Sequence, residues 1–371
     1  MKTPQLTPLA ASLPATVPFV GPEAQERQSG QPFVARLGAN ESAFGPSPKA
    51  IAAMQEAVKD VWMYADPESH NLRQALARHH AIPAETIMVG EGIDTLLGLA
   101  VRLYVGPGDH AVTSAGAYPT FNYHVAGFGG TLHAVPYKDD HEDPDSLIAK
   151  AVEVGAKMIY IANPDNPMGS YHDADAITRM IDRLPDDCML ILDEAYIELA
   201  PDGTAPDITL TRPNLLRMRT FSKAFGMAGA RVGYAISTPQ LISGFNKVRN
   251  HFGMSRISQA GALAAIADTE WITHIRQEVT TARARIAQIA TENSLRALPS
   301  ATNFVTIDCG RDGAFARAVL AALIQRAIFV RMPFVAPQDR CIRVSCGPSV
   351  QLDAFAAALP AALKQAHAEF E

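Results

Sequence analysis

The sequence has few of the residues that mark secreted or metal-binding proteins. Only four of its 371 residues are cysteine, they lie in apolar runs, and none has CxxC spacing: Cys188, Cys309, Cys341 and Cys346. This usage predicts reduced thiols in the core of a cytoplasmic protein. The eleven histidines are dispersed along the chain, so the sequence predicts no metal centre.

Long apolar runs and clusters of one charge are missing as well. No run is long enough to span a bilayer, and prolines at positions 4, 8, 14 and 18 interrupt the segment after Lys2 where a signal peptide would need apolar residues. Basic residues are scattered and the formal net charge is -6, which disfavours binding to nucleic acid or to an anionic membrane. A hydrophobic content of 48% provides core for more than one small domain, and we expect small-molecule substrates.

Between about residues 85 and 240, short apolar runs alternate with longer stretches of helical periodicity. This alternation is typical of βα units that build a mostly parallel sheet. We expect helices in "DTLLGLAVRLY", "DSLIAKAVEVG" and "DADAITRMIDRL", each opening on an aspartate suited to capping. The seven expected strands are residues 86–90, 110–114, 131–135, 157–162, 189–193, 215–220 and 231–236.

The chain after residue 255 has a different pattern, which predicts a smaller α+β domain. An alanine-rich helical region precedes "NFVTIDC", a helix around 313–326, the strand candidates "IFVRM" and "CIRVSC", and a closing helix from about 350 to 368. Near the start, Pro48 is expected in the first turn of a helix. We divide the chain into an N-terminal arm or small-domain segment (1–45), a large domain (46–255) and a small domain with its connecting long helix (256–371).

Ligands of open α/β sheets bind beyond the carboxyl ends of the strands, so the loops there are candidate site segments. After residues 86–90 comes "EGIDTLL", where backbone N–H groups at a helix start can face an anion, although a plain helix start explains the same residues. Thr95 replaces the third glycine of a dinucleotide fingerprint, which disfavours a nicotinamide site. After 157–162, "NPDNPMG" holds Asn166 in a non-helical pose with a free amide, or simply forms a turn.

Charged side chains follow the next two strands. Asp193 ends an apolar strand, where a carboxylate needs a cationic partner unless it caps a helix, and Tyr196 lies three residues on. Lys223 follows residues 215–220, where burial would lower its pKa toward that of a usable amine nucleophile. Taken singly, Lys223 and Arg231 could be ordinary surface charges. Together, a lysine for a Schiff base, a carboxylate for a pyridine nitrogen, donors for a phenolic oxygen and a phosphate cradle match pyridoxal 5'-phosphate (PLP).

A family resemblance extends over nearly the whole chain. It is carried by "VPFVGPE", "LGANESAFGPSP", "YADPES", "GEGIDTLL", "PTFNYH", "NPDNPMG", "DEAYIE", "RTFSKAFGMAGARVGY", "IFVRM" and "CIRVSCG". The chain resembles fold-type I PLP-dependent enzymes of the class I and II aminotransferase family, in the branch of the histidinol-phosphate aminotransferases. The resemblance implies an α/β fold: a large domain with a mostly parallel central sheet between helices, plus a smaller α+β domain.

The resemblance also implies roles for individual residues. Lys223 would form the Schiff base with PLP and carry protons as the general base, and Asp193 would pair with the pyridinium nitrogen. Tyr196 and Asn166 would hydrogen-bond the phenolic oxygen, and Phe121 would stack on the ring.

A phosphate grip and a shared dimer site are implied in the same way. The phosphate would be held by Thr220, Ser222, Arg231 and the backbone of Gly92, Ile93 and Asp94. Tyr64 would reach the phosphate bound by the neighbouring subunit of a homodimer.

Substrate-binding residues are implied around two arginines. Arg343 matches the family's substrate-carboxylate arginine, and Arg331 matches an arginine that some members use for an acidic substrate group. Asn40 and Asn303 are placed with them. Phe19 stands where many histidinol-phosphate aminotransferases have a tyrosine whose hydroxyl helps to bind the substrate phosphate, and a phenyl ring cannot make that bond.

The reaction implied is ping-pong transfer of an amino group from a donor to a 2-oxo acid such as 2-oxoglutarate, in amino-acid biosynthesis. Histidinol phosphate and an aromatic or other amino acid both stay open as donors. Two further readings stay open: a threonine-phosphate decarboxylase on the same scaffold, and a non-catalytic binding protein with this fold.

Overall fold

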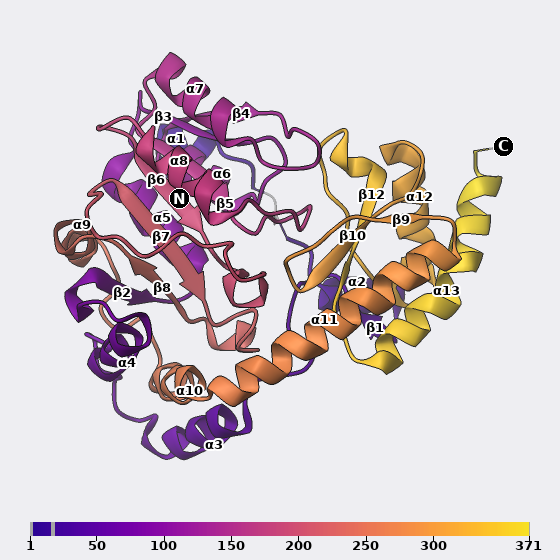
Figure 1. The fold of residues 1–371 in the computed structure, drawn as a ribbon, viewed down its shortest axis with the longest axis horizontal. Coiled ribbons are helices and arrows are strands. Elements are labelled where there is room, and N and C mark those ends of the chain that lie inside the picture. Colours follow the sequence, from indigo (N-terminus) through magenta and orange to yellow (C-terminus); the bar gives the residue numbers. More distant parts are fainter. Residues whose placement is uncertain (1–2, 16–18, 371) are drawn as a thin grey trace.

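The computed structural model describes residues 3–15 and 19–370, which form two lobes joined by a long helix (Figure 1). Lys2 and Pro18, used above to argue against a signal peptide, lie outside the described residues. The larger lobe is built on a seven-stranded sheet, and the smaller one on a three-stranded sheet with a two-stranded pair beside it. No helix among the described residues is long and apolar enough to cross a membrane.

The large sheet has the strand order β2-β8-β7-β6-β5-β3-β4. All seven segments predicted from the sequence are strands: β2 (Ile87–Gly90), β3 (His110–Ser114), β4 (Thr131–Val135), β5 (Met158–Ala162), β6 (Met189–Asp193), β7 (Leu215–Thr220) and β8 (Gly233–Ile236). Neighbouring strands are parallel except that β8 runs antiparallel to β2 and β7. The largest boundary error is at β8: Arg231 adopts φ 54°, a left-handed conformation that no strand contains.

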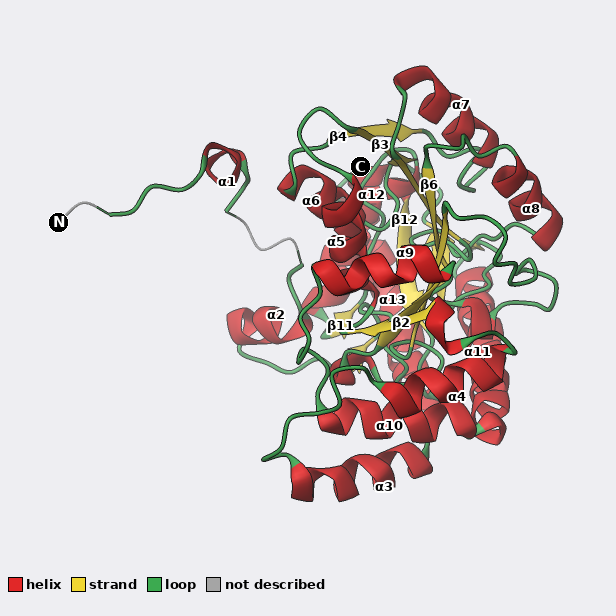
Figure 2. Ribbon diagram, turned by 90° about the vertical axis from the view of Figure 1, so that its left-hand side faces the viewer, coloured by secondary structure: helices red, strands yellow, loops and turns green. Residues whose placement is uncertain are grey.

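Helices cover both faces of this sheet, as alternating βα units require (Figure 2). One face packs on α5 (Ile93–Tyr104), α6 (Thr120–Gly127) and α9 (Pro239–Gly244). The opposite face packs on α4 (His70–His80), α7 (Pro144–Val154), α8 (Ala174–Asp182) and α10 (Arg256–Ala267). The helix α3 (Pro48–Ala57) packs on α10 and has Pro48 in its first turn, as predicted.

Only one of the three predicted capping aspartates is confirmed. Asp173 caps α8 by accepting a hydrogen bond from the backbone of Ala176. The cap of α7 is Asp143 and not Asp145, because Pro144 takes the first helical position. The cap of α5 is Gly92, with φ 85°, so Asp94 lies inside the first turn.

The small lobe has its own apolar core. The antiparallel sheet β12-β10-β9 and the parallel pair β1-β11 pack with three helices around this core. Its elements are β1 (Ala35–Arg36), α11 (Thr269–Glu292), β9 (Arg296–Ala297), β10 (Phe304–Asp308), α12 (Gly313–Gln325), β11 (Ile328–Phe329), β12 (Cys341–Ser345) and α13 (Ser349–Ala368). The strand expected in "IFVRM" is shorter than predicted: β11 ends at Phe329, and Arg331 makes only an isolated bridge to Arg343.

Short elements complete the fold. The N-terminal helices are α1 (Pro8–Ser12) and α2 (Pro22–Ser29), and the 3-10 turns are Val58–Asp60, Ala84–Thr86, Ile197–Leu199, Ala228–Ala230, Phe245–Lys247 and Gln338–Arg340. The division at residues 45 and 255 stays a prediction, and α10, placed beyond it, packs on the large lobe. All four cysteines are buried free thiols, as the sequence predicts.

Candidate functional site

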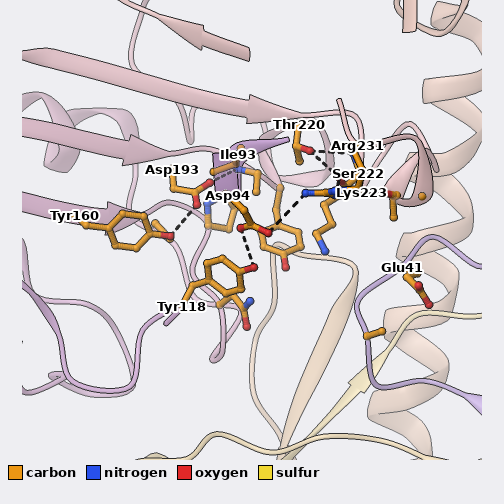
Figure 3. Close-up of a pocket in the computed structure, with 18 residues that line it drawn as sticks. Glu41, Ile93, Asp94, Tyr118, Tyr160, Asp193, Thr220, Ser222, Lys223 and Arg231 are labelled. Carbon is orange, nitrogen blue, oxygen red and sulfur yellow. Dashed lines mark hydrogen bonds and ion pairs between the residues drawn. The ribbon is translucent and has the colours of Figure 1, made fainter. Parts of the chain in front are cut away.

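A cavity of about 340 Å³ lies at the carboxyl ends of β5, β6 and β7, beside the first turn of α5 (Figure 3). Each of these ends contributes a polar side chain, because the chain leaves a buried strand there and enters a loop. Lys223, Asp193, Tyr196 and Asn166, which were predicted from three separate motifs, all line this cavity.

Lys223 lies in the loop after β7, and its Nζ points into the cavity. Nζ donates a hydrogen bond to the carbonyl oxygen of Asn40 at 3.0 Å and lies 5.5 Å from the centre of the Tyr196 ring. Burial, and then the positive charge of Arg343, lower the pKa of Lys223 to about 8. Near neutral pH a minor fraction of the amine is therefore unprotonated, but this fraction is far larger than in an ordinary lysine, as a nucleophile or general base requires.

Asp193 ends β6 and is 5% exposed. Its carboxylate accepts hydrogen bonds from the hydroxyl of Tyr160 at 2.7 Å and from the backbone N–H of Ala195 at 3.0 Å. Burial raises the pKa of Asp193 to about 6. No salt bridge to Asp193 forms among the described residues, so a cationic group entering the cavity would find a prepared counter-charge.

Tyr160 was missed by the sequence analysis. It lies in β5, is fully buried, and its ring stacks on that of Phe121 at 5.1 Å between centroids. The available signal was a single hydroxyl in the otherwise apolar run "MIYIA", which needs a buried hydrogen-bond partner.

An anion-binding corner lies at the other end of the cavity, where the first turn of α5 meets the loop after β7. The first backbone N–H groups of α5, at Ile93 and Asp94, have no partner within their own helix. The Thr220 hydroxyl lies 3.0 Å from the Ser222 hydroxyl and accepts a hydrogen bond from the Ser222 backbone N–H. Arg231 closes the corner, with a guanidinium nitrogen 3.6 Å from the Asp94 carboxylate.

Two glycines make this corner possible. A β-carbon on Gly233 would lie 2.9 Å from the backbone carbon of Gly92 and 2.9 Å from the backbone nitrogen of Ile93. A β-carbon on Gly92 would lie 2.4 Å from the Arg231 guanidinium. The first turn of α5 can approach β8 and Arg231 only because both side chains are absent.

Two hydrogen-bonded pairs, Asn40 with Tyr196 and Arg343 with Asn166, form a polar wall. The Tyr196 hydroxyl accepts a hydrogen bond from the Asn40 amide at 3.2 Å. The Arg343 guanidinium donates to the side-chain oxygen of Asn166, and at 3.3 Å to the Gly38 carbonyl. Burial lowers the pKa of Arg343 to about 10, so it stays cationic at neutral pH.

A second cavity of about 300 Å³ shares Tyr118, Asn166 and Lys223 with the first. Arg331 and Arg343 line it together with Phe19, Asn40, Asn122 and Phe334. Two guanidinium groups in one recess next to Lys223 favour a substrate with anionic groups. Phe19 is 38% exposed, and its ring lies 6.2 Å from that of Tyr118.

Two residues expected in this chain's site lie away from both cavities, and so does Tyr64, which was predicted to reach the neighbouring subunit's site instead. Phe121 is fully buried in the core beneath the sheet edge and does not line either cavity, because α6 begins at Thr120 and turns this side chain inward. Asn303 is buried behind the cavities, where it donates hydrogen bonds to the carbonyls of Asn40 and Glu41. Tyr64 is 78% exposed and packs against Phe252, away from this chain's own cavity.

Comparison with known proteins places the chain in a family. The sequence profile described as "Aminotransferase class I and II" matches residues 34–359. Histidinol-phosphate aminotransferase from Anaeromyxobacter sp. is 36% identical over 334 residues, which is 88% of this chain and 90% of that protein. The fold is that of the fold-type I PLP-dependent transferases predicted from the sequence.

Solved structures agree with this placement. The crystal structure of histidinol-phosphate aminotransferase from Sinorhizobium meliloti in complex with pyridoxal-5'-phosphate superposes with a TM-score of 0.95 at 51% identity, over 98% of both chains. Aspartate aminotransferase from Rhizobium meliloti, at 17% identity and a TM-score of 0.80 over 98% of this chain, shares the fold. The chain belongs to the class I and II aminotransferase family.

Proposed function

We propose that this chain transfers the amino group of histidinol phosphate to a 2-oxo acid such as 2-oxoglutarate. Its reaction class follows from its family: the chain is a PLP-dependent aminotransferase. The observation that carries the choice of substrate is the recess in which Arg331 and Arg343 lie beside Lys223, taken with the 51% identity to the histidinol-phosphate aminotransferase named above.

The chemistry of the cavity fits PLP. The amine of Lys223 and the carboxylate of Asp193 line one cavity with the anion-binding corner of Ser222 and Arg231. These are the groups that an aldehyde, a pyridine nitrogen and a phosphate require. When bound, PLP supplies an electrophilic carbon for the substrate amine and a ring that withdraws electrons from the α-carbon.

The residues of the chain would position and protonate the reactants. Asp193, itself fixed by Tyr160, would hold a proton on the pyridine nitrogen. Tyr196 and Asn166 would donate hydrogen bonds to the phenolic oxygen. Lys223 would act as the general base that removes the proton from the substrate α-carbon.

The residue that stacks on the ring is proposed to be Tyr118 in place of Phe121. Tyr118 lines both cavities, and its hydroxyl donates to the Asp94 carboxylate at 3.0 Å, which fixes the ring beside the first turn of α5. Burial raises the pKa of Tyr118, so its hydroxyl stays protonated and able to donate.

Arg343 and Arg331 would bind the anionic groups of the two substrates in turn. A guanidinium binds phosphate and carboxylate in the same forked geometry, so one recess suits both an amino-alcohol phosphate and a 2-oxo diacid. Asn40 remains a proposed substrate contact. Asn303 is proposed to act indirectly, by donating a hydrogen bond to the Asn40 carbonyl oxygen, which also accepts a hydrogen bond from Lys223.

A substrate panel tests the proposal. Purified enzyme with 2-oxoglutarate is offered histidinol phosphate, phenylalanine or threonine phosphate, and glutamate and carbon dioxide are measured. We expect glutamate with histidinol phosphate at the highest kcat/KM. A preference for phenylalanine would point to Phe19 as the sign of an aromatic substrate. Carbon dioxide from threonine phosphate would restore the decarboxylase reading, which the relatives named above do not favour.

A homodimer with shared active sites is proposed from the exposed aromatic side chains near α3. The rings of Tyr64 and Phe252 lie 4.7 Å apart and these residues are 78% and 54% exposed, and Trp62, two positions before Tyr64 in the chain, is 80% exposed. Exposed aromatic clusters of this kind mark protein interfaces. A second copy would cover them and bring Tyr64 to the partner's phosphate corner. The four buried free thiols fit the reducing cytoplasm, where we propose that the enzyme works.

A further inference from the structure

Behind the loop that carries Asn166, two carboxyl groups lie side by side in the core of the large lobe. Glu142 and Asp165 are each 2% exposed. Their carboxyls interact with one another, and the Ser114 hydroxyl at the end of β3 also faces Glu142. Two buried carboxylates in contact repel each other strongly unless one of them carries a proton.

The hydrogen bonds around the pair indicate which carboxyl carries that proton. Asp165 accepts from the Tyr137 hydroxyl at 2.8 Å and from the backbone N–H of Met168 at 3.0 Å, as a carboxylate does. Glu142 Oε1 accepts from the backbone N–H of Ala162 at 2.9 Å, but its Oε2 is buried without a partner among the described residues. A hydroxyl at Oε2 would satisfy both that atom and the remaining acceptor site of Asp165.

The electrostatic surroundings agree with this assignment. Burial, and then the charge of Asp165, raise the pKa of Glu142 well above its usual range. Tyr137, Tyr160 and Asp193 are titratable groups that face Glu142. His141, Tyr196 and Arg343 face Asp165, and the positive charges of His141 and Arg343 favour its ionised form.

The pair ties together the loop between β5 and α8. Glu142 Oε1 accepts a hydrogen bond from the backbone N–H of Ala162, the last residue of β5. The backbone carbonyl oxygen of Glu142 lies 2.7 Å from His172 Nε2. Asp165 holds Met168, which lies on the far side of Asn166. The backbone of Asn166 is therefore bracketed by two hydrogen bonds to the same carboxyl pair.

We propose that Glu142 stays protonated and donates its Oε2–H to Asp165, and that this pair positions the Asn166 amide and, through it, the Arg343 guanidinium. Glu142 and Asp165 touch neither cavity, so both are positioning residues. The consequence for catalysis rests on the proposed role of Asn166 toward the phenolic oxygen of PLP, whereas the shared proton does not.

The shared proton is tested on apoenzyme by infrared difference spectroscopy. Glu142→Gln keeps the shape and provides an amide N–H for Asp165, but it has no carboxylic acid. The spectrum of the parent minus Glu142→Gln should show the carbonyl band of a neutral carboxylic acid at pH 7. The matched control Glu153→Gln, at an exposed glutamate of α7, should show none. A difference spectrum without that band would mean that Glu142 is ionised, and the proposal would fail.

The positioning role is tested on holoenzyme with Glu142→Met, which keeps the length but cannot donate. We expect kcat/KM to fall about ten- to a hundred-fold, because small misplacements of catalytic groups cost that much. The pH midpoint of the visible cofactor band should shift, and Glu142→Gln should restore both values. Equal midpoints and rates in the two variants would show that the pair does not position Asn166. If the proposed cofactor role itself is wrong, the parent shows no visible band, while the infrared result stands.

Discussion

Lys223 lies where burial and a neighbouring guanidinium both work against its charge. Among the residues that the structure describes, its Nζ donates only to the carbonyl oxygen of Asn40, and Asp193 influences its pKa only weakly. The chain thus keeps an amine available for covalent chemistry in the same cavity as the Asp193 carboxylate and the anion-binding corner of Ser222 and Arg231.

Removing that amine gives the first prediction. Lys223→Ala should abolish transamination, yet PLP should still bind non-covalently, because the corner formed by Thr220, Ser222 and Arg231 is untouched. Mass spectrometry after borohydride reduction should find PLP attached to the parent and not to the variant. Lys247→Ala, in a 3-10 turn remote from the cavity, is the control and should behave as the parent. Parental turnover by Lys223→Ala would refute the assignment.

The lowered pKa of Lys223 gives a second prediction. The amine is protonated below about pH 8 and free above it, whereas an ordinary lysine becomes free only near pH 10.5. The rate at which apoenzyme attaches PLP covalently should therefore rise with pH up to about 8 and then level off. Stopped-flow absorbance measures this rate. A rate that keeps rising through pH 10 would show that the surroundings of Lys223 do not depress its pKa.

At the scale of elements, the anion-binding corner depends on how closely β8 approaches the first turn of α5. Gly233→Ala would place a methyl group against backbone atoms of Gly92 and Ile93, which cannot move aside as a side chain can. We expect unfolding free energy to fall by about 1–3 kcal/mol, and PLP affinity to fall because the N–H groups of α5 shift. Chemical denaturation and PLP titration measure the two effects.

The control for this prediction is Gly127→Ala in α6. A β-carbon there meets nothing within 4 Å, and the backbone is helical. It should leave PLP affinity unchanged and stability equal or slightly higher. If Gly233→Ala binds PLP as tightly as Gly127→Ala does, the close approach of β8 and α5 does not matter to the site.

The elements of the large lobe could be predicted from the sequence because the spacing of apolar residues and the positions of turn-forming residues indicate the same boundaries there. Most of the strands are short apolar runs, and β2, β4, β5 and β6 end at or directly before a glycine, proline, asparagine or aspartate. Both the sheet and the segments carrying Asn166, Asp193 and Lys223 could therefore be predicted. These loops meet because parallel strands bring their carboxyl ends to one edge.

What the sequence could not show depends on side-chain direction and on distant contacts. The segment "AYPTF" offers two aromatic residues three positions apart, and only the start of α6 at Thr120 decides that Tyr118 faces the cavity and Phe121 the core. Tyr160 and Asn303 hydrogen-bond to residues distant in the sequence, and no local sequence pattern indicates such partners. Asp143 displaced Asp145 as a cap because Pro144 fits the first helical position.

For the whole molecule, the exposed aromatic cluster near α3 and the distance of Tyr64 from its own cavity suggest that one chain is half of a working unit. Complementation of two inactive variants tests this. Lys223→Ala lacks the amine, and Tyr64→Ala lacks the side chain proposed to cross to the partner. Refolded together, they form mixed dimers in which one site has both residues, so activity should return. Either variant alone should stay impaired.

The control for complementation uses Lys223→Ala with Val350→Asp. Val350 is 73% exposed on α13, far from the aromatic cluster, so Val350→Asp should be fully active on its own. Mixing it with Lys223→Ala should give no activity beyond that of Val350→Asp alone. If Lys223→Ala and Tyr64→Ala together are no more active than the sum of the two alone, the sites are not shared.

The central claim is that Lys223, the phosphate corner and the two arginines together carry out amino transfer from histidinol phosphate. It is tested most directly by a single turnover without a 2-oxo acid. The PLP-loaded enzyme is mixed with histidinol phosphate, and its visible spectrum is recorded by stopped flow. The account predicts complete conversion from the PLP spectrum to that of the aminated cofactor, reversed by adding 2-oxoglutarate. No spectral change with histidinol phosphate, alongside rapid conversion by phenylalanine, would contradict it.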